Sequence, residues 1–161
     1  MEDGQVPAVA ENRAKGDKRS MKKTNIVLKG IRADEMSFKL NNVRPQEGKL
    51  DLKPTFSRKV RRAVENERVS FVTLSVQIAS APESPKPFDL LASVTGIFET
   101  DASTEEEKRF AVVECTELLF PYLRSAVTNL TTAAMSAPVV LPVVSGPLFP
   151  EDRKLEDEYF S

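Results

Sequence analysis

The stretch from Leu118 to Phe149 constrains the fold more than any other part of the chain, because a helical pattern is followed there by closely spaced prolines. Pro121 cannot donate a backbone hydrogen bond, so we expect it in the first turn of a helix. After it, apolar residues recur at spacings of three and four and form one stripe: Leu123, Ala126, Val127, Leu130, Ala133 and Ala134. The residue before a proline avoids the helical region, so this helix should end before Pro138.

An apolar arm follows this helix, and its prolines exclude it from a central strand. The prolines stand at positions 138, 142, 147 and 150, and the apolar residues between them are Val139, Val140, Leu141, Val143, Val144, Leu148 and Phe149. Side chains of this kind that cannot join a sheet must pack on a neighbouring surface or on a partner. Two interpretations therefore remain open: the arm covers the protein's own core, or it offers an apolar binding surface.

The first half of the chain is predicted to form strands. Residues 24–40 alternate between apolar and polar side chains, with a slip near Gly30 that indicates a bulge, so we expect one long bent strand or two. Residues 41–48 contain a proline and are predicted to form a crossover loop. Leu50 and Leu52 indicate a short extended piece at a sheet edge. Residues 58–68 are polar; we expect at most one helical turn there, with its cations facing solvent.

The clearest pattern is an antiparallel hairpin made of residues 69–79 and 88–99, joined by a proline-bounded turn. A helix should follow, capped by Asp101, Ser103 or Thr104 and broken at Pro121. Strands thus come first and helices last, which predicts an α+β fold. Residues 1–22 are polar and without periodicity, so we expect a disordered N-terminal tail carrying a basic cluster. Residues 151–161 form either a short helix or a frayed tail.

Composition excludes most catalytic chemistry. The chain has 161 residues and no histidine, so a Ser-His-Asp or Cys-His arrangement is impossible. Cys115 is the single cysteine and stands among apolar residues, which predicts a buried, inert thiol and no zinc site built from cysteines. The formal net charge of −1 argues against binding nucleic acid. No apolar run approaches the ~20 residues of a membrane span, and no secretory signal is evident, so we expect a cytoplasmic protein without a metal or cofactor and without enzymatic activity.

Several short motifs, in order along residues 24–150, resemble SecB, the bacterial export chaperone family. The most specific is Leu119-Phe120-Pro121-Tyr122-x-Arg124, which is similar to a helix start in the last third of that family. Weaker matches are Ser37-Phe38, Lys49-Leu50-Asp51-Leu52, Gly96-Ile97-Phe98, Pro142-Val143 and Leu148-Phe149. The resemblance implies a domain over residues 23–150 in which a four-stranded antiparallel sheet has a long helix and a shorter C-terminal helix packed to one side.

The resemblance also implies a function: a holdase that binds unfolded polypeptide clients during protein export and translocation, assembled as a homotetramer that is a dimer of dimers with its main helices between the dimers. The client-binding residues carried over from the family are Phe120, Tyr122, Val143, Leu148 and Phe149. A second surface, the exposed sheet face, would bind the motor protein SecA through Glu35, Ser37, Lys39, Asp89 and Leu91.

Two residues depart from what that second surface requires. Lys39 stands where an acid is expected and Leu91 replaces another acid, which should weaken docking on a basic partner. Some SecB-like chaperones instead guard the antitoxin of a toxin–antitoxin pair, and this variant fits the altered face. The alternative from another class is a non-chaperone interaction subunit whose apolar arm binds one fixed partner.

Overall fold

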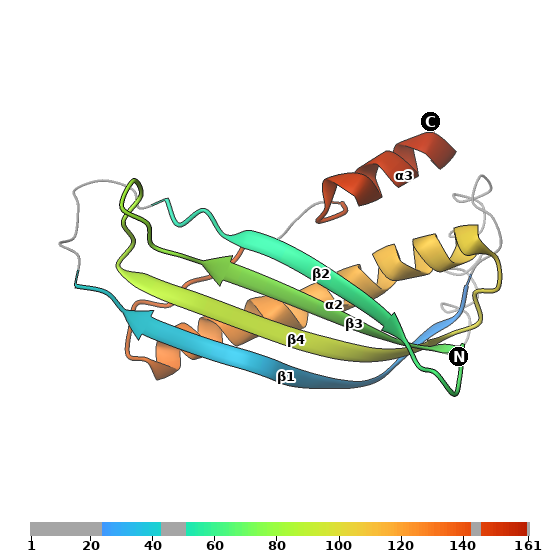
Figure 1. The fold of residues 1–161 in the computed structure, drawn as a ribbon, viewed down its shortest axis with the longest axis horizontal. Helices are drawn as coiled ribbons and strands as arrows, with labels where there is room; N and C mark the ends of the chain where they lie inside the picture. Colours follow the sequence, from blue (N-terminus) through green and yellow to red (C-terminus); the bar gives the residue numbers. More distant parts are fainter. Residues whose placement is uncertain (1–23, 43–50, 143–145, 161) are drawn as a thin grey trace, which may run out of the picture.

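One antiparallel sheet and two helices make up the fold (Figure 1), and the computed structural model describes residues 24–42, 51–142 and 146–160. In chain order the elements are β1 (Ile26–Leu40), β2 (Thr55–Arg62), β3 (Val69–Ile78), β4 (Phe88–Thr100), α2 (Glu105–Ala133) and α3 (Pro150–Phe160). The strand order is β1-β4-β3-β2, and every neighbouring pair is antiparallel. This architecture confirms the predicted fold class. The predicted tail, residues 1–22, lies outside the described residues, as do Gly48 and most of the predicted crossover loop.

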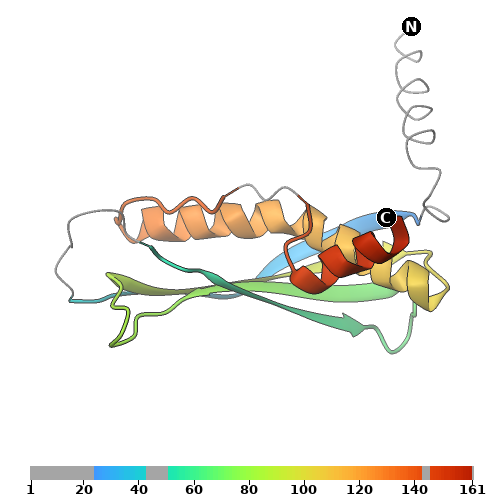
Figure 2. The same cartoon turned by 90° about the horizontal axis from the view of Figure 1, so that it is seen from above.

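Figure 2 shows that both helices lie on the same side of the sheet. Alternation along the central strands sends one set of side chains towards α2, among them Val72 and Leu74 of β3 and Leu90 of β4, all of which are buried. From α2, Leu119, Leu123 and other apolar residues complete the same core. The predicted hairpin and its apolar face are therefore confirmed, and the opposite sheet face carries no helix among the described residues.

β1 is one continuous strand, as one of the two predicted alternatives had it. Its pairing with β4 shifts register between Leu28 and Gly30, which confirms the predicted bulge, and shifts again between Ala33 and Glu35. β1 is also an edge strand of the sheet, and Val27, Met36 and Leu40 are exposed along it.

The prediction for the segment before β3 was wrong. Residues 51–54 are not a strand, whereas β2 covers part of the stretch for which a helical turn was expected. β2 pairs along its whole length with β3, so that Phe56, Arg58 and Val60 alternate on the helix side of the sheet. The fourth position on this side is Arg62, and the two arginines concealed the period of two. The expectation that Arg58 faces solvent was also wrong, because its side chain is 13% exposed.

The expected break at Pro121 was wrong as well, since α2 continues through it. The helix begins at the predicted cap Thr104, whose hydroxyl accepts a hydrogen bond from the Glu107 amide at 3.0 Å. A proline in a helix interior costs about 3 kcal/mol or more. Apolar side chains on both sides of Pro121 are buried against one sheet, so tertiary packing outweighs this cost. α2 changes direction near its middle, as Figure 2 shows.

After α2 the proline-rich arm turns back along the helix (Figure 2). The hydroxyl of Thr131 accepts a hydrogen bond from the Val139 amide at 3.0 Å, and that of Thr128 donates to the Val139 carbonyl at 2.8 Å. Leu141 is buried in the core, whereas Val140 is 70% exposed. The arm thus covers part of the protein's own core and leaves some apolar surface uncovered.

Candidate functional site

The sheet face opposite the helices brings together the residues predicted to bind a partner. In the ladder between β1 and β4, Ser37 lies opposite Leu91, Lys39 lies opposite Asp89, and Glu35 lies opposite Ser93. The first residue of each pair is exposed. Asp89 is occupied within the chain, since it accepts hydrogen bonds from the Ser80 amide at 2.7 Å and the Asn41 side chain at 3.3 Å.

The hydrogen bond from the Ser80 amide holds the pKa of Asp89 below its usual range, and Asn41 adds to the effect. Asp89 therefore anchors the turn between β3 and β4, and its carboxylate oxygens are engaged within the chain. This intramolecular role was not visible in the sequence.

The centre of the open face is lined with hydroxyl groups. Thr73 and Thr95 share a hydrogen bond of 2.6 Å, and Ser75 and Ser93 share one of 2.8 Å. The Thr95 hydroxyl also donates to Asp34 and is the main reason why the pKa of Asp34 lies below its usual range. These side chains are short, so the middle of the face is low and polar.

A groove on the helix side brings together two of the predicted client-binding residues. Phe120 of α2 and Leu148 of the arm line a cavity of ≈240 Å³ together with Pro121, Arg124 and Glu117. This volume is below the roughly 300–1,000 Å³ of typical small-molecule pockets. Its mixture of apolar walls and charged rim suits one or two side chains of a polypeptide.

The structure separates the other predicted client-binding residues from this groove. Tyr122 is half exposed, and at 100° per residue it points to the side of α2 away from Phe120. Phe149 is 8% exposed and belongs to the core. Val143 lies outside the described residues. Phe120 is itself largely buried, so its role at the groove is to form the floor.

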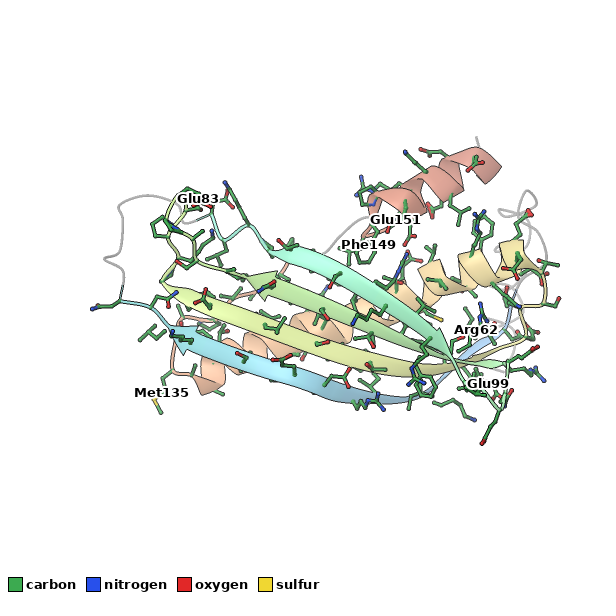
Figure 3. All side chains as sticks on the ribbon, in the orientation of Figure 1. Arg62, Glu83, Glu99, Met135, Phe149 and Glu151 are labelled. Carbon is green, nitrogen blue, oxygen red and sulfur yellow. The ribbon has the colours of Figure 1, made fainter. Side chains whose placement is uncertain are left out.

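Sequence reasoning missed a network around Arg58. Its guanidinium donates to both carboxylate oxygens of Asp152, at 2.6 and 3.1 Å, and to the hydroxyl of Thr116 at 3.0 Å. The guanidinium carbon also lies 4.6 Å from the centre of the Phe149 ring. Figure 3 shows Phe149 at the start of α3, where the chain reaches the edge of the sheet. Nothing in the sequence links Arg58 to Asp152, and they are 94 residues apart.

Cys115 is buried in the core, as predicted. Burial, with a smaller contribution from Glu114, raises the pKa of its thiol to about 12. At pH 8 the thiolate population should therefore be roughly a thousandfold below that of an ordinary cysteine. We expect a disulfide reagent such as Ellman's to leave the folded protein unlabelled for hours and to label it at once in denaturant. Rapid labelling without denaturant would show that α2 detaches readily from the sheet.

Within the described parts of the chain, no three metal-ligating side chains of the histidine, cysteine, aspartate or glutamate type lie together. No helix there is long and apolar enough to cross a membrane. The candidate site comprises three features: the open sheet face, the groove at Phe120 and Leu148, and the Arg58 network.

Fold and sequence together define the class. The family model for SecB, described as preprotein translocase subunit SecB, matches residues 20–149, and the chain belongs to this family. An uncharacterised protein of Methanocaldococcus jannaschii, MJ0357, is 27% identical over 130 residues, which cover 78% of this chain and 79% of that protein.

Among solved structures, the fold is similar to that of the Mycobacterium tuberculosis SecB-like chaperone Rv1957 in complex with a ChAD peptide from the HigA1 antitoxin Rv1956. The match has a TM-score of 0.59 at 20% identity and covers 74% of this chain and 90% of that one. A protein of unknown function from Streptococcus agalactiae gives a TM-score of 0.47 at 13% identity, covering 76% of this chain and 100% of that one.

Proposed function

We propose that this protein is a cytoplasmic holdase chaperone, which binds unfolded or non-native polypeptides and has no enzymatic activity. The observation that carries the proposal is the groove between α2 and the arm, with Phe120 as its floor and Leu148 in its wall. Unfolded chains share apolar side chains and free backbone groups, so a general binder needs apolar grooves more than a shaped pocket. Family membership supports the same function.

The test is suppression of aggregation with several unrelated denatured proteins, measured by light scattering at matched chaperone concentrations. We expect suppression by the native protein and weaker suppression by Leu148→Ser, which removes an apolar wall of the groove. The matched control is Val140→Ser, because Val140 is an exposed apolar residue of the same arm outside the groove. Absence of suppression for every client would overturn the holdase proposal.

A chaperone dedicated to one client, such as an antitoxin, is the second candidate. The support for it is the structural neighbour that was solved with an antitoxin peptide, together with the altered sheet face. A dedicated chaperone should protect its own client strongly and unrelated proteins poorly, and that range of clients separates the two functions. A non-chaperone subunit would bind one folded partner and suppress no aggregation.

We predict weak delivery to SecA. A partner surface that binds acids is basic, so Lys39 repels it and the uncharged Leu91 does not attract it. The affinity for SecA should therefore be at least about tenfold below that of an ordinary SecB, a loss of roughly 1.4 kcal/mol of binding free energy. The double change Lys39→Glu and Leu91→Glu should recover affinity in a titration with purified SecA. Lys59→Glu, on the same face but on β2, is the control. Ordinary SecA affinity in the unchanged protein would show that this face was misinterpreted.

We propose a homotetramer formed as a dimer of dimers. The predicted stripe residues Leu123 and Val127 are buried within the chain and cannot carry an interface. Two other features support assembly. β1 is a long exposed edge, and such an edge readily pairs with another strand. α2 exposes Leu118 and Tyr122, four residues apart, on a side that packs neither on the sheet nor on the groove.

Sedimentation should show a tetramer at micromolar concentration, and Tyr122→Glu should halve the mass by placing a charge between the helices. Val64→Glu introduces the same charge at a residue that is 98% exposed at a turn, and it should leave the mass unchanged. A monomer at micromolar concentration for the unchanged protein would contradict the assembly.

A further inference from the structure

The first turn of α3 occupies a fully formed recognition site on β2 and α2. Arg58 holds Asp152 by two parallel hydrogen bonds, and both side chains are nearly buried, at 13% and 6% exposed. The third hydrogen bond of the guanidinium goes to the Thr116 hydroxyl, which is fixed in turn because it donates to the Val112 carbonyl at 2.7 Å. Bidentate pairing of arginine with carboxylate is geometrically selective and stronger than a neutral hydrogen bond.

Phe149 completes the site as the second recognition element. Its ring covers the guanidinium of Arg58 and is itself removed from solvent. Arg58 thus contacts an aromatic ring and, from the residue three positions later in the chain, a carboxylate. The backbone presents the two side chains together, because the Asp152 amide donates to the Phe149 carbonyl at 3.0 Å.

Beyond this turn α3 buries less of its surface. Most of its following side chains are exposed, and a cavity of ≈330 Å³ lies beside the ion pair, lined by Arg58 and Asp152 as well as by Arg109 and Val112 of α2 and Leu155 of α3. Partial desolvation and then the carboxylates of Glu156, Glu114 and Asp152 raise the pKa of Glu117 on α2. Among the side chains of α3 that the structure describes, only that of Asp152 is buried, so the first turn makes the tightest contact.

We propose that the Arg58 surface is a peptide-binding site that α3 fills as an internal ligand, and that it also accepts a partner segment carrying an aromatic side chain and, three residues later, a carboxylate. The partner segment would displace α3 and open the cavity between α2 and α3. The inference rests on the proposed chaperone function for the source of the segment, which would be a client polypeptide.

The carboxylate of the incoming segment is required by the burial of Arg58. A buried charge left without its partner is strongly destabilising, so a segment that takes the place of α3 and keeps Arg58 covered must supply an acid in place of Asp152. An apolar segment alone does not meet this need, and a lysine in place of Arg58 cannot reproduce the two parallel hydrogen bonds. The site therefore selects for a pair of side chains and not for general hydrophobicity.

The first test uses full-length Asp152→Asn, which preserves shape but weakens the internal ligand, and a fluorescent peptide with the sequence of residues 147–158. We expect the peptide to bind this variant at least about tenfold more tightly than the unchanged protein in anisotropy titrations. A peptide whose aspartate at the position of Asp152 is asparagine should lose that gain. The matched peptide control changes the glutamate at the position of Glu151 to glutamine, because Glu151 is 65% exposed and 3.9 Å from Arg58. Equal affinity of both altered peptides, or no gain in the variant, would overturn the proposal.

The second test needs no variant. Saturating peptide added to the unchanged protein should accelerate amide hydrogen exchange in α3 and leave α2 protected, and unchanged exchange in α3 would also overturn the proposal. As an extension of the first test, adding Arg58→Lys to the Asp152→Asn variant should abolish the gain in binding. Aggregation suppression is measured separately, so a chaperone that ignores the peptide and a peptide binder that suppresses no aggregation are distinguishable results.

Discussion

Phe149→Ser should lower the melting temperature by about 10 °C. Phe149 lies in the core and covers the guanidinium of Arg58, so the substitution loses apolar burial, leaves a cavity and exposes a buried ion pair. Removing a buried phenylalanine side chain costs about 3–5 kcal/mol. The expected loss is near the lower end, because the first turn of α3 can shift locally, and each kcal/mol corresponds to roughly 2–4 °C in a chain of this size.

The matched control for this prediction is Val140→Ser. Both residues belong to the same arm and both lose an apolar side chain, but Val140 is 70% exposed. Surface substitutions shift stability by about 0.5 kcal/mol or less, so the melting temperature of the control should be close to that of the unchanged protein. Calorimetry on the two variants decides the matter. If Phe149→Ser melted like the control, Phe149 would be an exposed groove wall, as the family resemblance implied.

The part of the fold that sequence predicted well is the part where one periodicity dominates. The hairpin of β3 and β4 has an uninterrupted period of two, with Val72 and Leu90 on its buried side, and the cap at Thr104 precedes three acids. At these places local propensity and tertiary packing favour the same structure, so the strands and the start of the helix could be predicted from the sequence.

The wrong predictions for β2 and for α2 have a common physical cause: both elements are stabilised by contacts between residues that are distant in sequence. β2 was concealed because Arg58 occupies a core-facing position, and that position is satisfied by Asp152 and Thr116. The continuation of α2 through Pro121 was concealed because the compensating burial lies on the sheet. Rules based on local sequence predict that an arginine faces solvent and that a proline ends a helix. In this protein both predictions fail because of contacts that exist only in the folded structure.

The candidate site shows the same division. The resemblance identified the groove residues Phe120 and Leu148, which the structure brings together. It also grouped Phe149 and Tyr122 with them, although Phe149 is buried against Arg58 and Tyr122 points away from the groove. A motif conveys which residues are neighbours along the chain, whereas their directions depend on the helix phase and on partners elsewhere.

Gly96→Ala is expected to destabilise the protein by about 1–3 kcal/mol, because the core around Gly96 has no room for a methyl group. A Cβ at this position would lie 2.5 Å from Cε2 of Phe98 and 3.1 Å from Cδ1 of Leu119. Both neighbours are fully buried, so neither can move without disturbing the packing of α2 on β4.

Gly30→Ala provides the matched control, since the nearest atom to its added Cβ would be Cδ1 of Ile97 at an ordinary 3.8 Å. We expect its free energy of unfolding in urea to stay within about 0.5 kcal/mol of the unchanged protein. If Phe98 is the obstacle, Phe98→Leu combined with Gly96→Ala should lose less stability than the sum of the two single changes, with a coupling of at least about 0.5 kcal/mol. Strict additivity would show that Phe98 is not the obstacle, and equal stability of the two alanine variants would show that the core around Gly96 has more room than the structure indicates.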